Sequence, residues 1–484
     1  MKKFDREDPG ILWVSADAQK GDGSYSKPFG TLSGALGIVK PGEKIVLMQG
    51  VYSQDQTIEI SGSAELPIEI CSAPDSEVTI EGGCWYFYDV SDVVVSDLIF
   101  RNSQHGSLSI IGNCRRNRFH NIRFLNCGNL DKATCTVFFG GAGARFNMFE
   151  QCVFEHVKRE RKDVDAANAS IAVMISDGDS ESSLQIKNHI LRRNTFRNFD
   201  YGIIVGSGES SDYSSGHIIE YNKIENCGED GILVKAGDTQ VRGNLVSMCR
   251  ANSISIAAGV GSVVEDNRVV DGYRGILISD SGHTLVNNCI VRCSKEAVRA
   301  SGKSDAENRP ATNLFIQENT IIKSHQSSAT IGNPEGEGIF MESGATCIVE
   351  KNLVYGAGDP YKIEHRESPQ SALCVLRDNV CCGGGKASEG FSCSEINFSQ
   401  MTDDDFRNSS GYGAVGVMLT PETFDPHMDE TSGEVDYIRA SVLEGDDGEL
   451  IIPDDSDEEK GVSFLNEDLL GLEEIMTDFG LMDE

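Results

Sequence analysis

Eight asparagines recur along the middle of the chain, each between two short apolar runs. The strings HIIEYNKIENC, TQVRGNLVSMC, SVVEDNRVVDG and HTLVNNCIVRC share this pattern. Consecutive marker asparagines lie 21 to 33 residues apart. Such a period indicates a repeat architecture whose units pack only against their neighbours. The markers are Asn194, Asn222, Asn244, Asn267, Asn288, Asn319, Asn352 and Asn379.

The shortest of these units is too short for a two-helix repeat and lacks the framework of a leucine-rich repeat. It fits one coil of a right-handed parallel β-helix, in which three short strands are joined by turns. An Asn at a fixed turn position then hydrogen-bonds along the axis to the next coil. Cys227, Cys249 and Cys293 each follow a marker by five residues, which predicts stacked, buried thiols. The predicted fold class is therefore all-β, a single-stranded right-handed parallel β-helix.

Three regions follow from this pattern. Residues 1–40 read as an N-terminal cap with a short helix at TLSGALGIV, because an open solenoid end would expose core and strand edges. Residues 41–400 read as the β-helix, and residues 401–484 as an acidic C-terminal extension, partly disordered or helical. The charged segments 158–188 and 301–312 are predicted to be loops between coils, where binding faces are often built.

The charge is strongly uneven. The chain has 42 basic and 76 acidic residues, a net charge of -34. From Pro421 to Glu484 there are 22 acidic residues against Arg439 and Lys460, a net of -20. This balance argues against a nucleic-acid-binding protein, which needs a basic footprint. A protein partner for the acidic tail is one interpretation, and a tail folded back on its own chain is the other.

The sequence carries few signals of localisation. No run approaches the roughly 18–20 apolar residues of a membrane span, and no apolar stretch follows the two lysines of MKKFDREDPG. The 15 cysteines are an odd number and read mainly as reduced core thiols. We therefore expect no membrane association. The expected location is the cytoplasm, or a virion or the exterior by a non-classical route, with secretion if the chain is a processed form.

The run from Asn194 to Asn288 resembles the polysaccharide lyases of family 6, the alginate lyase and chondroitinase B type. The strings NHILRRNTFRNFDYGIIVGSGES and SSGHIIEYNKIENCGEDGILVKAGDTQVRGN carry the match, which continues more weakly through NSISIAAGVGSVVEDN and GHTLVNN. The resemblance implies a pectin-lyase-like β-helix that cleaves uronate-containing glycans by β-elimination. Part of the match reflects architecture, because any two β-helices share an Asn and Gly rhythm.

The resemblance also implies a set of site residues. In that family a Lys removes the C5 proton of the uronate, and Lys235 in GEDGILVKA falls on its position. Asn198, Glu229 and Asp230 fall on or beside positions that hold calcium, which neutralises the uronate carboxylate. Gly228 occupies the first acidic position of the family pattern. His283 in GHTLVNN falls on a recurrent His of the cleft.

One family residue is missing. The family places Arg and His on the following coil, where this chain has Ala257 and Ala258. Loss of such an electrostatic group typically costs about 10²–10³ in rate. Arg250, Arg274 and Arg299 are candidate replacements, although each lies at a different place in its coil. The run HVKRERKD offers further substrate-binding cations, namely Lys158, Arg159, Arg161 and Lys162.

Two functions remain open at this point. The first is a lyase-like enzyme on an acidic polysaccharide, with the residues above in the roles given. The second is a non-catalytic β-helix that binds glycan or serves as a structural or assembly subunit of a phage or secreted particle. Each site residue also has a structural interpretation. Lys235 could be a solvated strand-end residue, Glu229 and Asp230 turn acids, Asn198 a ladder residue and His283 a surface strand residue.

Overall fold

The structure is a computed structural model, and it describes most of the first 401 residues. The described ranges are 5–128, 133–141, 143–157, 169–175, 186–206, 214–302, 310–322, 336–342, 345–355, 357, 360–363, 373–382 and 396–401. The described chain divides into an N-terminal unit that ends at Gln240 and a C-terminal unit that begins at Val241. The predicted acidic extension lies outside the described residues beyond Met401.

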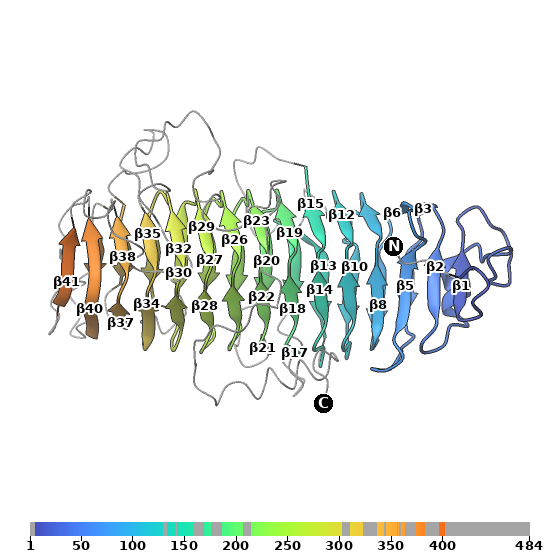
Figure 1. Cartoon of the computed structure of the whole chain (residues 1–484), viewed down its shortest axis with the longest axis horizontal. Coiled ribbons are helices and arrows are strands. Elements are labelled where there is room, and N and C mark those ends of the chain that lie inside the picture. Colours follow the sequence, from blue (N-terminus) through green and yellow to red (C-terminus); the bar gives the residue numbers. More distant parts are fainter. Residues whose placement is uncertain are drawn as a thin grey trace. The chain divides into compact units, whose positions relative to one another are not determined.

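In the N-terminal unit three parallel strand ladders recur once per coil (Figure 1). The first ladder contains β1 (Ile11–Val14), β2 (Lys44–Leu47), β5 (Ile68–Ser72), β8 (Val93–Ser96), β11 (Arg118–His120), β14 (Met148–Glu150), β18 (Ile190–Arg192) and β22 (Ile218–Glu220). The second contains β3 (Gly50–Tyr52), β6 (Val78–Glu81), β9 (Ile99–Arg101), β12 (Arg123–Leu125), β15 (Val153–Glu155), β19 (Thr195–Arg197) and β23 (Lys223–Glu225). The third contains β4 (Gln56–Ile58), β7 (Trp85–Tyr88), β10 (Leu108–Ile111), β13 (Thr134–Gly140), β16 (Ser170–Ile175), β20 (Tyr201–Val205) and β24 (Ile232–Val234). A short pair, β17 (Ile186–Lys187) and β21 (Ser214–Ser215), lies outside the ladders.

The C-terminal unit repeats the same three ladders. The first contains β25 (Gln240–Arg242), which begins at the boundary, β28 (Val263–Glu265), β31 (Thr284–Val286), β34 (Leu314–Gln317), β37 (Thr346–Glu350) and β40 (Leu373–Cys382). The second contains β26 (Leu245–Ser247), β29 (Arg268–Val270), β32 (Cys289–Val291), β35 (Thr320–Ile322) and β38 (Leu353–Tyr355). The third contains β27 (Asn252–Ile256), β30 (Arg274–Ile278), β33 (Val298–Ala300), β36 (Ile339–Met341) and β39 (Tyr361–Ile363). The last strand, β41 (Ile396–Met401), pairs with β40. The all-parallel pairing confirms the predicted β-helix.

Like residues stack on like residues in the core. Phe124 of β12 lies on Phe154 of β15 with ring centroids 4.6 Å apart, and Phe154 lies on Phe196 of β19 at 4.7 Å. All three rings are almost fully buried. Because an inward residue of one coil can contact only the coils above and below, the same residue type at the same register packs well at every step.

The marker asparagines form the predicted ladder. In the N-terminal unit the Nδ2 of Asn194 donates to the Oδ1 of Asn222 at 3.0 Å. In the C-terminal unit the same bond joins each marker to the next, at 2.9 or 3.0 Å, from Asn244 to Asn379. All eight side chains are buried. Each Oδ1 acceptor in this chain of bonds also receives a backbone N–H, as in the bond from the Asn194 amide to Asn222 at 3.0 Å.

Two boundaries differ from the prediction. The cap contains the predicted helix as α1 (Leu32–Leu36), with the Thr31 hydroxyl accepting from the Gly34 amide at 3.3 Å. Its strand β1, however, pairs with β2, so the first ladder already begins at Ile11 rather than after residue 40. The segment 158–188 was wrongly predicted to be loop throughout, because its apolar run SIAVMI forms β16 within the third ladder. In 301–312, residues 303–309 lie outside the described ranges.

Candidate functional site

Lys235 follows β24 directly, at the carboxyl end of a third-ladder strand. Its backbone amide donates to the carbonyl of Val205 at 2.7 Å, so the backbone position is fixed by the coil before it. The side chain is half-buried. No ion pair or side-chain hydrogen bond joins its ammonium group to any residue in the described part of the chain. The ammonium group therefore has no carboxylate there to neutralise it.

Acidic residues gather at the opposite end of the same strand. The Glu229 amide donates to the carbonyl of Asp200 at 2.8 Å, which brings the two acidic residues onto neighbouring coils. The Asp200 carboxylate is buried and accepts from the amide and hydroxyl of Ser170 at 2.7 and 2.8 Å. A Cβ added to Gly228 would lie 2.5 Å from the Asp200 carboxylate oxygen. Asp200 therefore explains why the first acidic position of the family pattern is a glycine here.

The acids raise the pKa of their neighbours. Burial, and then the charge of Asp200, raises the pKa of Glu229. Burial together with the charges of Glu229, Asp230 and Asp200 raises the pKa of Tyr201 to about 12. Sequence reasoning missed Asp200, because its position in NFDYGI carries no recognisable motif. The predicted pair of acids is thus part of a group of three near the start of β24.

The donor set does not fit a calcium site. Asn198 has a positive φ of 65°, and its Oδ1 accepts from the Nδ2 of Asn226 at 2.6 Å. Its own Nδ2 donates to the carbonyl of His156 at 2.9 Å. Asp230 is buried, and no cluster of three His, Cys, Asp or Glu side chains within the described ranges is arranged to hold a metal. Asn198 acts here as a ladder residue between turns.

His283 lies in the core and does not line a surface. Its side chain is fully buried, and its Nδ1 accepts the backbone amide of Ser262 at 3.1 Å. This corrects the expectation of a cleft residue. The physical reason is a second polar ladder, which sequence reasoning missed: His189 and His217 of the N-terminal unit accept backbone amides through Nδ1 in the same way, both at 3.3 Å.

The predicted substrate-binding arginines of the C-terminal unit differ in their surroundings. Arg274 donates through Nε to Glu296 at 2.7 Å, and Arg299 binds the other oxygen of Glu296 at 2.8 Å and also pairs with Glu342. Burial works to raise the pKa of Glu296, but the hydrogen bond from Arg274 and the charges of both arginines outweigh it and lower that pKa. Arg274 and Arg299 are therefore held by carboxylates. Arg250 is exposed.

The two remaining predictions concern the alanines that replace the family's Arg and His, and the basic run after His156. Ala257 follows β27 directly and is half-buried, and Ala258 is buried. Lys158, Arg159, Arg161 and Lys162 lie outside the described residues.

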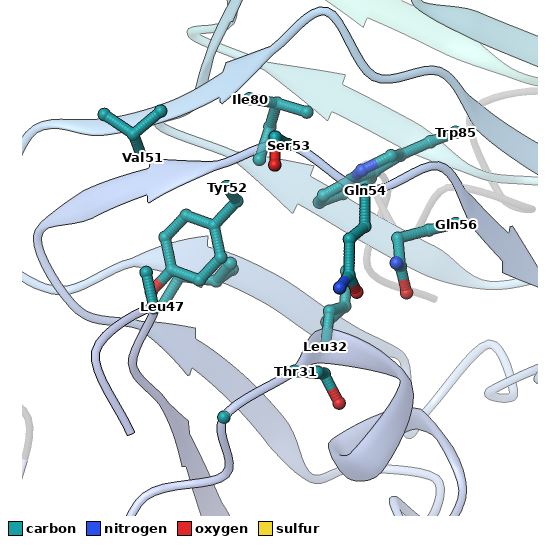
Figure 2. A pocket seen from close by; sticks show the side chains of 12 residues that line it. Thr31, Leu32, Leu47, Val51, Tyr52, Ser53, Gln54, Gln56, Ile80 and Trp85 are labelled. Carbon is teal, nitrogen blue, oxygen red and sulfur yellow. The ribbon is translucent and has the colours of Figure 1, made fainter. Parts of the chain in front are cut away.

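A cavity of about 120 Å³ lies elsewhere, between α1 and the first coils. Figure 2 shows Tyr52 on one side of it and the amides of Gln54 and Gln56 on the other. The Tyr52 hydroxyl donates to the carbonyl of Met48 at 2.8 Å, and Gln56 Oε1 accepts from the Ser33 hydroxyl at 2.9 Å. None of the predicted site residues lines this cavity.

Comparisons with known proteins support the fold. A family model described as "right handed beta helix region" matches residues 181–332. Pectate lyase L of Thermoclostridium stercorarium is 25% identical over 323 residues, which cover 54% of this chain and 24% of that protein. This chain therefore spans about a quarter of the length of that curated relative.

Solved structures give the same result. The PL6 family alginate lyase AlyGC matches with a TM-score of 0.59 and 18% identity, over 81% of this chain and 53% of that one. A mannuronic acid specific polysaccharide family 6 lyase from human gut microbiota matches with a TM-score of 0.56 and 17% identity, over 80% and 92% of the two chains. The right-handed parallel β-helix and the resemblance to β-helix polysaccharide lyases are thus confirmed, and the chain spans about half the length of the first structure.

Proposed function

We propose that this chain binds a uronate-containing acidic polysaccharide and cleaves it by β-elimination, with Lys235 as the base. The observation that carries the proposal is the position of Lys235. It stands at the carboxyl end of β24, half-buried, and forms no ion pair with a carboxylate of the described residues. The similar proteins named above, a pectate lyase and two family 6 lyases, support this substrate class.

The base has one main task in this reaction, which is to remove a proton. The Lys235 amine takes the proton from C5 of the uronate, the C–H electron pair forms the C4–C5 double bond, and the glycosidic bond at C4 breaks. The departing oxygen takes up a proton from water. Charge develops on the uronate carboxylate as C5 loses its proton, so a nearby cation stabilises the transition state. We route no step through calcium, because Asn198 and the buried Asp230 are a poor donor set for it.

A second candidate function is glycan binding without cleavage. Ala257 favours it, because alanine stands where the resemblance expects an arginine. The ion pairs of Arg274 and Arg299 favour it too, since Glu296 and Glu342 already hold both guanidinium groups. Under this alternative Lys235 contributes only charge to binding.

An eliminase assay on a panel of substrates tests the proposal. The purified chain is mixed with alginate, pectate, chondroitin sulfate and dermatan sulfate, with added calcium or with chelator, and the ultraviolet absorbance of the unsaturated uronate is followed. Absorbance that rises on at least one substrate is the expected result. The chelator arm separately tests the calcium requirement that the resemblance implies and that the donor set does not support. No product on any substrate, from folded protein that still binds one of them, overturns elimination and supports the second candidate.

A further inference from the structure

Three basic residues occupy one register position on three successive coils of the N-terminal unit. They lie in the turns that lead from the third ladder to the first. Arg115 pairs in parallel with Arg145, and Arg145 pairs in parallel with Lys187. Neighbouring strands lie about 4.7–4.9 Å apart, so the backbone positions recur at that step along the coils. We call Arg115, Arg145 and Lys187 the basic column.

No carboxylate of the described residues forms an ion pair with the basic column. Arg145 is exposed, and Arg115 and Lys187 are half-buried. The Nε of Arg115 donates to the amide oxygen of Asn113 at 2.7 Å, which orients its guanidinium group without neutralising it. None of the three cations pairs with a carboxylate from the described ranges. Arg197 of the same unit differs, because it forms a 2.8 Å bond to Glu225.

Like charges surround Arg115. Burial lowers its pKa, and the positive charges of Arg145 and Arg116 lower it further. Arg116 differs from the column, because Asp92 accepts two hydrogen bonds from it, both at 2.8 Å. Three neighbouring cations that form no ion pair with a described carboxylate are unexpected in a chain whose net charge is -34, since such a pair would relieve their repulsion. Such an uncompensated set is typical of a surface that meets an anion.

The register of the column continues toward the proposed base. Lys187 of β17 pairs with Ser215 of β21, and Ser215 pairs with Gly237. Gly237 lies two residues after Lys235 in the same turn. The column and Lys235 therefore occupy turns that follow third-ladder strands within one unit, separated by the coil that carries Ser215.

We propose that the basic column binds the carboxylates of an acidic polysaccharide chain that runs across the coils toward Lys235. The choice of ligand rests on the proposed function. A polyuronate carries one carboxylate on each sugar, so its charges recur regularly, as the cations of the column do. Long-range attraction to the acidic protein is weak, but a local cluster of cations sets the potential where the polymer binds.

The test compares two triple variants that change net charge equally. In the first, Arg115, Arg145 and Lys187 are each replaced by Gln. In the matched control, three exposed lysines of the cap are replaced by Gln: Lys20, Lys27 and Lys40. Binding of fluorescently labelled alginate and polygalacturonate oligosaccharides is measured by anisotropy at low and moderate salt, after circular dichroism has shown that both variants are folded.

We expect the column variant to raise Kd about tenfold at low salt and to flatten the salt dependence, because exposed charge pairs are individually weak. The cap variant should change Kd less than twofold. The single variant Arg145→Gln, at an exposed site, should weaken binding about threefold. Equal affinity in the column variant and the unmodified chain overturns the proposal, and so does equal loss in the cap variant. Tighter binding of a single-stranded DNA oligonucleotide than of either glycan overturns the choice of ligand.

This inference can fail separately from the proposed function. A Lys235→Met chain should bind the labelled glycans nearly as well as the unmodified chain, even though it forms no unsaturated product. A column variant that binds and cleaves normally would overturn the column and leave the proposed function standing. Column-dependent binding without any cleavage would support the column and favour glycan binding without catalysis.

Discussion

His189 and His217 lie stacked in the core of the N-terminal unit, with ring centroids 5.4 Å apart and ring planes 15° apart. Each Nδ1 accepts a backbone amide, so each ring is neutral with its proton on Nε2. The Nε2 of His217 lies 2.8 Å from the hydroxyl of Ser214. If Nδ1 of either ring were protonated, its hydrogen would point at the hydrogen of the backbone amide that now donates to it. The pair therefore makes the unit sensitive to acid.

We expect the N-terminal unit to lose stability as the pH falls below about 6.5, the ordinary value for histidine. Burial lowers the pKa of His189 to about 3, and burial followed by the neighbouring ring lowers the pKa of His217 well below its usual value. At these two residues the unfolded chain thus binds up to two more protons than the folded one in this window. Each costs about 1.4 kcal/mol of unfolding free energy per pH unit. Urea unfolding at several pH values between 7.5 and 4.5 measures the slope.

The double variant His189→Asn, His217→Asn should flatten that slope, because asparagine keeps an acceptor for the backbone amide and does not titrate. Asn147 already does this at the same register, where its Oδ1 accepts the Asn117 amide at 3.0 Å. Replacement of the exposed His105 by Asn is the control. An unchanged slope in the double variant would contradict the account.

The asparagine ladder should be costly to break. In Asn267→Ala the amide of Asn244 loses its acceptor at 3.0 Å, and the side chain of Asn244 loses one at 2.9 Å. A buried polar group left unsatisfied costs about 1–3 kcal/mol, so we expect a loss of about 2–4 kcal/mol. Urea unfolding monitored by circular dichroism measures it. The control Asp75→Gly, at an exposed residue with φ 56°, should change stability by no more than about 0.5 kcal/mol. Similar effects of the two changes would show that the ladder is not stabilising.

The buried thiols should be unreactive in the folded chain. Burial, the largest influence on each, raises the pKa of Cys152 to about 12 and of Cys114 and Cys289 to about 11. The thiolate is the reactive form, so little of it exists near neutral pH. Iodoacetamide labelling followed by peptide mass spectrometry should find these three sites unmodified in native protein and fully modified in urea. Rapid native labelling of any of them would contradict their placement.

The sequence was sufficient to predict the repeat and its asparagine ladder. A residue that stacks on a residue of the same type one coil away must recur in the sequence. Asn194 and Asn222 illustrate this, and Cys227 and Cys249 are buried as predicted. The strand β16 was missed, since charged segments on both sides hid one apolar run.

The second polar ladder could not be recognised in advance. Its positions hold several residue types, among them Asn147, His189 and Ser262, so no one letter marks the ladder on every coil. His283 was assigned to the cleft from the resemblance, which gave no sign of this ladder. The left-handed turn residues were equally hidden, because Arg193 and Tyr221 adopt φ of 55° and 51° without belonging to a type that favours it. Whether Lys235 acts as a base is a question of chemistry that neither the repeat nor the fold decides.

Introducing an arginine at position 257 is a second test of the catalytic interpretation. In the family that the sequence resembles, an arginine at the position of Ala257 stabilises the charge that develops on the uronate. We expect Ala257→Arg to raise the rate of elimination by about 10²–10³. The control Ala257→Gln has a long polar side chain without the charge and should leave the rate near that of the unmodified chain. No gain from a folded arginine variant would argue for glycan binding without cleavage.

The most direct test of the account is the elimination rate of Lys235→Ala beside that of the unmodified chain. Both are assayed on the best substrate of the panel, with the exposed-lysine variant Lys20→Ala as the control. The account predicts that unsaturated product forms with the unmodified and control chains and falls by at least about 10²-fold with Lys235→Ala, because a positioned base contributes about 10²–10⁴. Equal rates in all three chains would contradict the role of Lys235.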